Sequence, residues 1–78
     1  MNINESTAQR VAAAITTTGN SVAGVAAATL IPRSTLQRKL AGKSPISVID
    51  LHVIARALGV RSRDLLPDEL LNDHSQAA

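Results

Sequence analysis

The 78-residue sequence predicts a single small domain built only of α-helices. Three observations lead to this class. The apolar residues are almost entirely Ala, Val, Ile and Leu, with 13 alanines and no aromatic residue, and such small side chains suit closely packed helices. Apolar residues recur every three or four positions, and Gly or Pro interrupts this pattern at intervals of one short helix. No segment alternates apolar and polar residues as a strand does.

Five short helices are expected, and the first two have recognisable ends. Each is preceded by a residue that can cap a helix N-terminus, and a glycine stops the first. The candidates are Asn4 or Ser6 as the first cap, Gly19 as the stop, and Asn20 or Ser21 as the second cap. The second helix, over residues 22–28, is rich in small side chains, which let another helix approach closely.

The third helix is expected to begin near Pro32, because proline is excluded from helix interiors but tolerated in a first turn. The chain therefore turns at residues 29–31. Leu36 and Leu40, four positions apart, form the buried side of this helix, and Gly42 ends it.

The fourth helix, over residues 48–58, is the most apolar segment. Ser47 and Asp50 have capping-box spacing before it, and Gly59 ends it. Two apolar sectors indicate a helix central to a bundle. One sector comprises Val48, Leu51, Ile54, Ala55 and Leu58, and the other Ile49, Val53 and Ala57.

The last expected helix is short. Ser62 can cap it, and Leu65 and Leu66 are its apolar residues. Residues 73–78 are expected to fray. The domain therefore spans the whole chain, 1–78, with no linker and no repeat.

Composition argues against several classes of function. The chain has no Cys, and His52 and His74 lie 22 positions apart, so we expect no metal and no cofactor. The apolar run 22–31, itself interrupted by Gly24 and Thr29, is too short to span a membrane, and no signal peptide precedes it, so the expected location is cytoplasmic. Ser, His and Asp form no ordered nucleophile–base set, so we expect no enzyme and no small-molecule substrate.

The placement of charge is more informative than the net charge of +2. Four cations occur within eleven residues without an acid, whereas acids dominate the C-terminal end. The cations are Arg33, Arg38, Lys39 and Lys43, and the acids are Asp64, Asp68, Glu69 and Asp73. A local basic cluster favours nucleic-acid binding. A solvated cationic helix face is the other interpretation.

The second and third helices, within residues 21–41, form a candidate helix-turn-helix pair. A helix that reads DNA needs one side anchored to the protein and another that presents donors to base edges. Arg can pair with guanine and Gln with adenine, while Ser and Thr bond either. The candidate base-reading residues are Arg33, Ser34, Thr35, Gln37 and Arg38. Ser34 is equally suited to capping the third helix.

Short motifs occur in a fixed order between residues 21 and 66. They are Val25-Ala26, residues 31–36 (IPRSTL), residues 42–45 (GKSP), residues 54–60 (IARALGV) and residues 64–66 (DLL). In these motifs the chain resembles the lambda-repressor-like helix-turn-helix domains of phage Cro proteins, phage repressors and bacterial XRE-type regulators. The segment 31–42 is closest to actinobacterial and actinophage members. The resemblance implies a compact five-helix fold whose third helix enters the major groove.

The resemblance also implies a function. It indicates a sequence-specific regulator of transcription, a phage Cro-like protein or small repressor that occupies operator DNA in the cytoplasm of a bacterial host. Lys43 and Ser44 fall in a loop that touches phosphate, and Asn20 and Ser21 at a helix N-terminus whose amides hold one. Lys39 lies nearer the buried side of the third helix. Its ammonium can contact phosphate, or its aliphatic stem can pack on the protein, and both roles stay open.

Two positions depart from the pattern of these domains. Many members have Gly in the turn where this chain has Leu30, and a leucine with positive φ is strained, so we expect the turn to differ slightly. Many have Gln near the start of the second helix, as a clamp on the backbone and the third helix. Val22 stands there, which puts that clamp in doubt.

Alternatives remain for assembly and function. The second apolar sector of the fourth helix, with Leu65, Leu66, Leu70 and Leu71, either packs within the monomer or forms a weak or DNA-assisted homodimer, which we favour slightly. The rival function is a protein-interaction module, an antitoxin or adaptor, on the same fold. An excisionase or architectural role is a further DNA-binding option.

Overall fold

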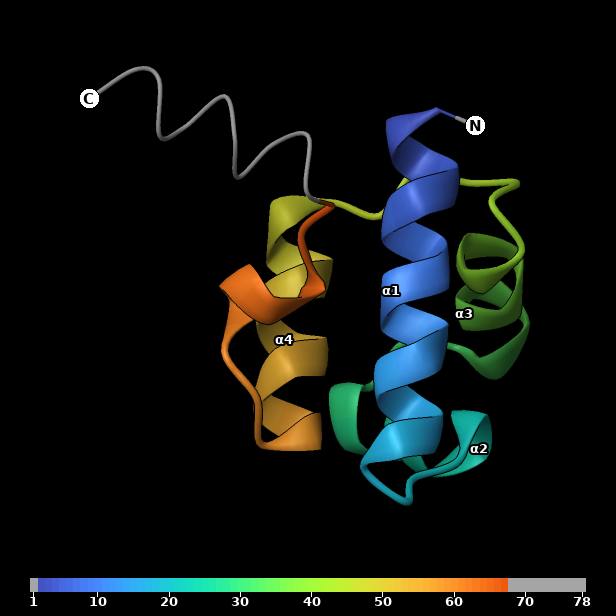
Figure 1. Cartoon of the computed structure of the whole chain (residues 1–78). Helices are drawn as coiled ribbons and strands as arrows, with labels where there is room; N and C mark the ends of the chain where they lie inside the picture. The colour runs from blue at the N-terminus through green and yellow to red at the C-terminus, as the bar shows by residue number, and fades with distance from the viewer. Residues whose placement is uncertain (1, 68–78) are drawn as a thin grey trace.

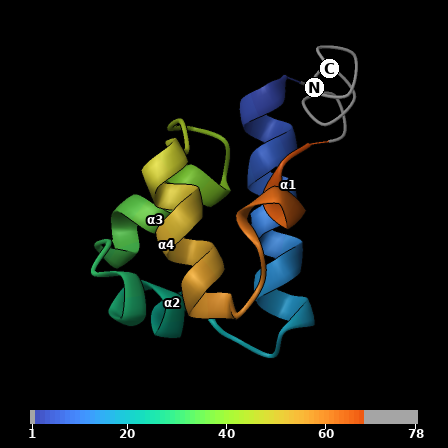
Figure 2. The same ribbon diagram turned by 90° about the vertical axis from the view of Figure 1, so that its left-hand side faces the viewer.

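The structure is a computed structural model, and it describes residues 2–67 of the chain. It contains four α-helices and one 3-10 turn. These are α1 (Ile3–Thr17), α2 (Val22–Thr29), α3 (Arg33–Leu40), α4 (Val48–Leu58) and η1 (Ser62–Leu65). In Figure 1, α1 runs lengthwise through the middle, with α3 on its right, α4 on its left and α2 at the lower end. Figure 2 shows η1 lying between α4 and α1, both of which it contacts.

The predicted all-α class is confirmed for the described residues, but the prediction of five helices is wrong. The fifth element is a single 3-10 turn, η1. Proline disfavours helical backbone in the residue before it, and Leu66, which precedes Pro67, is extended at φ −82° and ψ 142°. The cap position belongs to Arg61, not to the predicted Ser62. The tail expected to fray, residues 73–78, lies outside the described residues.

Helix α1 begins earlier than predicted. Its cap is Asn2, whose side-chain oxygen accepts from the Glu5 amide at 2.8 Å. The Glu5 carboxylate accepts in return from the Asn2 amide at 3.2 Å. The predicted caps Asn4 and Ser6 both lie inside the helix, because this reciprocal pair satisfies the first amides one turn sooner.

The core lies where the four helices and η1 meet. Its fully buried side chains come from every element, which is why even the short η1 is part of the fold. They include Val11, Val25, Leu36, Ile54 and Leu65. Val48 and Ile49, in the first turn of α4, remain 83% and 74% exposed, although the pattern placed Val48 with the buried sector.

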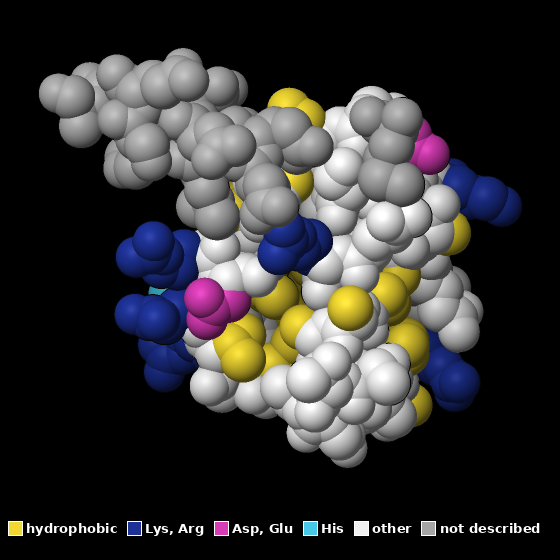
Figure 3. All heavy atoms as spheres, viewed as in Figure 1, with side chains coloured by type: hydrophobic (Ala, Val, Ile, Leu, Met, Phe, Trp, Pro, Cys, Tyr) yellow, Lys and Arg dark blue, Asp and Glu magenta, His cyan; other side chains and the backbone are white. Residues whose placement is uncertain are grey.

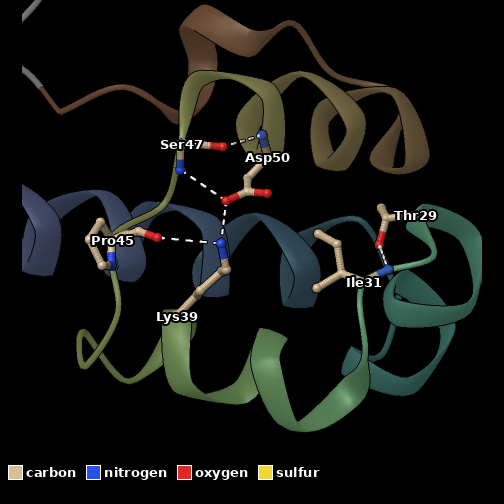
Figure 4. Close-up of polar contacts among 6 residues, drawn as sticks. All are labelled: Thr29, Ile31, Lys39, Pro45, Ser47 and Asp50. Atoms are coloured by element: carbon tan, nitrogen blue, oxygen red, sulfur yellow. Dashed lines mark hydrogen bonds and ion pairs between the residues drawn. The ribbon is translucent and has the colours of Figure 1, made fainter.

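The turn between α2 and α3 has a left-handed backbone at Leu30, a conformation that is strained for leucine. Leu30 has φ 63° and ψ 17°, and its side chain is 89% exposed. The expectation of a different turn is therefore wrong. Neighbouring contacts hold this corner, because the Thr29 hydroxyl donates to the Val25 carbonyl at 2.8 Å and accepts from the Ile31 amide at 3.4 Å (Figure 4). Ile31 packs against the core.

Leu30→Gly should stabilise the protein. A left-handed L-residue costs about 1–2 kcal/mol, and glycine avoids this cost while losing part of the gain, about 0.5–1 kcal/mol, to chain entropy. We expect a net gain of about 1 kcal/mol in the free energy of unfolding, measured from urea denaturation at unchanged slope. The matched control is Ala41→Gly, at a right-handed position, which should be destabilising. A loss of stability in both variants would contradict the prediction.

Candidate nucleic-acid interface

Helix α3 is anchored on one side only. Leu36 is fully buried and Leu40 is half-buried against the core, and the helix packs on α1 and α2. Its start is set by Pro32, which occupies the cap position without a side-chain hydrogen bond. Beyond its end, Gly42 has φ 77°, and a Cβ added there would lie 3.3 Å from Cγ of Glu5. The end of α3 is thus packed closely against the first turn of α1.

The outward side of α3 carries most of the predicted base-reading residues. Arg33, Ser34, Gln37 and Arg38 are exposed, and Thr35 is half-buried. Because residues four apart on a helix are neighbours, Arg33 lies beside Gln37 and Ser34 beside Arg38. Neither arginine side chain makes a hydrogen bond or ion pair within residues 2–67. These side chains therefore form one polar surface, the α3 face, with two guanidinium groups available to a ligand.

The predicted phosphate-contacting residues lie in two other segments. Asn20 is exposed beside α2, and its side-chain amide donates to the Thr18 hydroxyl at 2.8 Å. Ser21 caps α2 by accepting from the Gly24 amide at 3.0 Å. The remaining two, Lys43 and Ser44, follow α3 in the loop to α4, where Lys43 is exposed and Ser44 half-buried. Within the described residues, no hydrogen bond or ion pair joins the two segments to each other.

Lys39 lies apart from the α3 face and makes its contacts within the protein. Its ammonium pairs with the Asp50 carboxylate and donates to the Pro45 carbonyl at 3.4 Å (Figure 4). Both charged side chains are only 17% exposed. A phosphate at Lys39 would therefore compete with a contact that the protein already makes.

Asp50 also completes the cap of α4. Its carboxylate accepts from the Ser47 amide at 2.9 Å, and its own amide donates to the Ser47 hydroxyl at 3.0 Å, which confirms the predicted capping box. Burial raises the pKa of Asp50, but hydrogen bonds from Lys39 and Ser47, with the lysine charge, outweigh burial and hold this pKa below its usual 3.8. The sequence analysis missed the ion pair, because its partners are eleven positions apart across a loop.

A second group of cations lies on α4 and at η1. Figure 3 shows Lys and Arg side chains at two opposite edges of the molecule, one beside α3 and the other beside α4 and η1. In sequence, α4 contributes Arg56, and η1 with its cap contributes Arg61 and Arg63, all exposed. Arg61 makes a long contact of 3.9 Å with Asp64, and its side chain is 78% exposed. The sequence analysis assigned these three arginines no role.

The first turn of α4 borders an apolar hollow of about 460 Å³. Its lining combines the exposed end of α4 with residues from η1 and the extended segment after it. The lining residues are Val48, Ile49, Leu51, His52, Ser62 and Leu66. Part of the predicted second apolar surface, Ile49 and Leu66, thus lies at this hollow, whereas Leu65 is buried in the core.

Residues 2–67 contain no group of three His, Cys, Asp or Glu side chains that could hold a metal ion. In the same part of the chain, no single helix is long and apolar enough to cross a membrane. Helices α1 and α2 reach that length and composition only when taken together, and a bend of 103° separates them.

Asp50→Asn should make stability less dependent on acid pH. Because the folded protein lowers the pKa of Asp50, the stabilisation is present above the usual value of 3.8 and is lost as pH falls through the folded value. The variant should be less stable than the parent at pH 7, and the gap should close on acidification. Urea midpoints measured from pH 7 down to about pH 2 test this sign.

The control for that series is Asp64→Asn, whose partner Arg61 is 3.9 Å away and exposed, so the loss of its ion pair should change stability little. A gap between the parent and Asp50→Asn that stays constant over the whole pH range would contradict the assignment. A gap that widens on acidification would have the wrong sign and would contradict it as well.

A solved structure shares this arrangement of helices. It is described as a high-resolution crystal structure of the restriction-modification controller protein C.AhdI from Aeromonas hydrophila. The two chains are 24% identical with a TM-score of 0.74, over 80% of this chain and 94% of that chain. No model of a protein family matches the chain, and no curated protein matches it. The likeness shows a common fold, in agreement with the small helix-turn-helix domain that the sequence predicts.

Proposed function

We propose that the chain is a sequence-specific regulator of transcription that binds double-stranded DNA with α3 in the major groove. The α3 face is the observation that carries this proposal. It presents exposed hydrogen-bonding side chains and two unpaired guanidinium groups on a helix whose opposite side is anchored by the fully buried Leu36. A helix that reads base edges requires this division. The shared fold with a restriction-modification controller supports the same class of function.

Each side chain of the α3 face has a role that its chemistry suits. Arg33 and Arg38 can each donate two hydrogen bonds to a guanine, and Gln37 can pair with an adenine. Ser34 and Thr35 can bond either base, and the methyl group of Thr35 can contact a thymine methyl. The proposed reading of sequence thus rests on a patch of two helical turns.

Contacts with phosphate would fix the orientation of the protein on the duplex. Those assigned to this role are Asn20, Ser21, Lys43 and Ser44, with Lys39 as a further candidate. All eight Lys and Arg residues lie within residues 2–67, against three of the six acids, so the described part of the chain is strongly cationic. Neutralising phosphates with these cations would supply much of the affinity.

More specifically, we propose that the chain is a phage Cro-like protein or small repressor that acts by occupying an operator. Occupation needs no chemical step, so the chain would act by excluding other proteins from the site. A weak or DNA-assisted homodimer fits this mode, because two-fold dimers read half-sites about 34 Å apart. The exposed Val48 and Ile49 beside the apolar hollow support α4 as the contact surface.

Arg33→Ala and Arg38→Ala should each weaken binding to the preferred duplex by about 1–3 kcal/mol and relax the preference at one base pair. The preferred duplex is first selected from a random pool, and dissociation constants are then measured by titration over a range of salt concentrations. Arg61→Ala is the matched control, because it removes the same charge from an exposed arginine at the start of η1, outside the α3 face.

Unchanged binding in both α3 variants would show that α3 is not the reading helix. Binding of the parent to random duplex should also fall steeply between low and moderate salt. If salt has little effect, the rival function gains support, a protein-interaction module whose apolar surface docks another protein.

Ile49→Gln should disrupt the proposed dimer and leave the DNA-reading surface intact. Sizing of the complex with a two-half-site duplex should then show one protomer where the parent shows two, with binding to a single half-site unchanged. Ile3→Gln, an exposed isoleucine that does not line the hollow, is the matched control. Two protomers bound in the Ile49 variant would exclude this surface as the dimer contact.

A further inference from the structure

We propose that Lys39 is a positioning residue that ties α3 to the cap of α4, and that it does not contact phosphate. This inference rests on the proposed function, since what Lys39 positions is the α3 face. It assigns to one cation of the basic cluster a role that differs from the roles of Arg33, Arg38 and Lys43.

The contacts of Lys39 join three separate segments. The Lys39 side chain extends from the last turn of α3. Its ammonium donates to the Pro45 carbonyl in the following loop at 3.4 Å and pairs with Asp50 in the first turn of α4 (Figure 4). The Asp50 oxygen that accepts from Lys39 also accepts from the Ser47 amide at 2.9 Å. One carboxylate oxygen therefore holds both the end of α3 and the start of α4.

Few other contacts join α3 directly to α4. Helix α3 packs chiefly on α1 and α2, and α4 packs chiefly on α2 and η1. Within residues 2–67, no side-chain hydrogen bond other than the Lys39–Asp50 contact joins α3 to α4. Within the described residues this contact is thus the side-chain polar tie between the two helices, which also share packing on α2.

The direction and burial of Lys39 separate it from the cations that face solvent. At 100° per residue, Lys39 and Arg33 each lie 60° from the buried Leu36, but on opposite sides of it and 120° apart around the helix. Its side chain is 17% exposed. To reach a phosphate, the ammonium would have to leave Asp50, and the half-buried carboxylate would then lose its counter-ion.

A tie of this kind affects specific and non-specific binding differently. Non-specific affinity depends on the number of phosphates neutralised and tolerates small shifts of a helix. Reading of base edges requires side chains held at fixed positions. Loosening the tie should therefore lower the ratio of specific to non-specific affinity while leaving the salt dependence of binding unchanged.

Two variants with opposite changes in charge test the proposal. Lys39→Met removes a positive charge, and Asp50→Asn removes a negative one. Both should lower the ratio of specific to non-specific affinity, roughly tenfold, with the slope of log affinity against log salt unchanged, as expected when contacting residues are coupled. The double variant should lose no more than either single variant. Circular dichroism confirms that each variant is folded.

Lys43→Met is the matched control, because it removes an exposed lysine from the adjoining loop. It should lower the magnitude of the salt slope by about one and leave the specificity ratio intact. If Lys39→Met behaves like Lys43→Met, and Asp50→Asn leaves the ratio unchanged or strengthens binding to all duplexes, Lys39 is a phosphate contact and the proposal is overturned.

A readout without DNA separates this proposal from the proposed function. Amide hydrogen exchange should become faster in Lys39→Met at the cap of α4, above all at Ser47 and Asp50, and should not change in Lys43→Met. If the parent protein fails to discriminate between duplexes, the proposed function is wrong, and this exchange pattern still tests the tie. Unchanged exchange at both amides in Lys39→Met would overturn the tie itself.

Discussion

The burial of Leu36 is the constraint on which the rest of the interface depends. An eight-residue helix dominated by polar and charged side chains has no stability of its own in water. Leu36, fully enclosed by the other helices, supplies the contact that keeps α3 folded. Because only Leu36 and the half-buried Leu40 are required on that side, the remaining positions are available for groups that meet a ligand. Stability and binding are thus assigned to opposite sides of the same two turns.

The parts that the sequence could predict are those governed by local chemistry. The Ser47 cap with Asp50, the start of α3 after Pro32 and the end of α4 at Gly59 each depend on residues within one turn, and the structure agrees with them. The exposure of Arg38 also followed from spacing, since at 100° per residue it lies about 160° from both leucines of the same helix. Arg33 lies only about 20° from Leu40 around the helix, so its exposure did not follow from spacing.

What the sequence could not predict depends on contacts across the fold. The partner of Lys39 lies beyond a loop whose course only the packed helices define, so its spacing carried no signal. The left-handed Leu30 goes against a local rule, because the neighbouring Ile31 is held by the core. Likewise, η1 stops after one turn, because Leu66 before Pro67 is extended, and Leu65 is buried all the same.

Leu30 also bears on how domains of this shape are recognised. A corner in this conformation is ordinarily associated with glycine, yet here a large aliphatic residue occupies it. The shape of the corner is therefore a property of the packed helices around it. Searches that demand glycine at that position will overlook proteins with the same architecture, and comparisons of backbone geometry are the more reliable guide to such relatives.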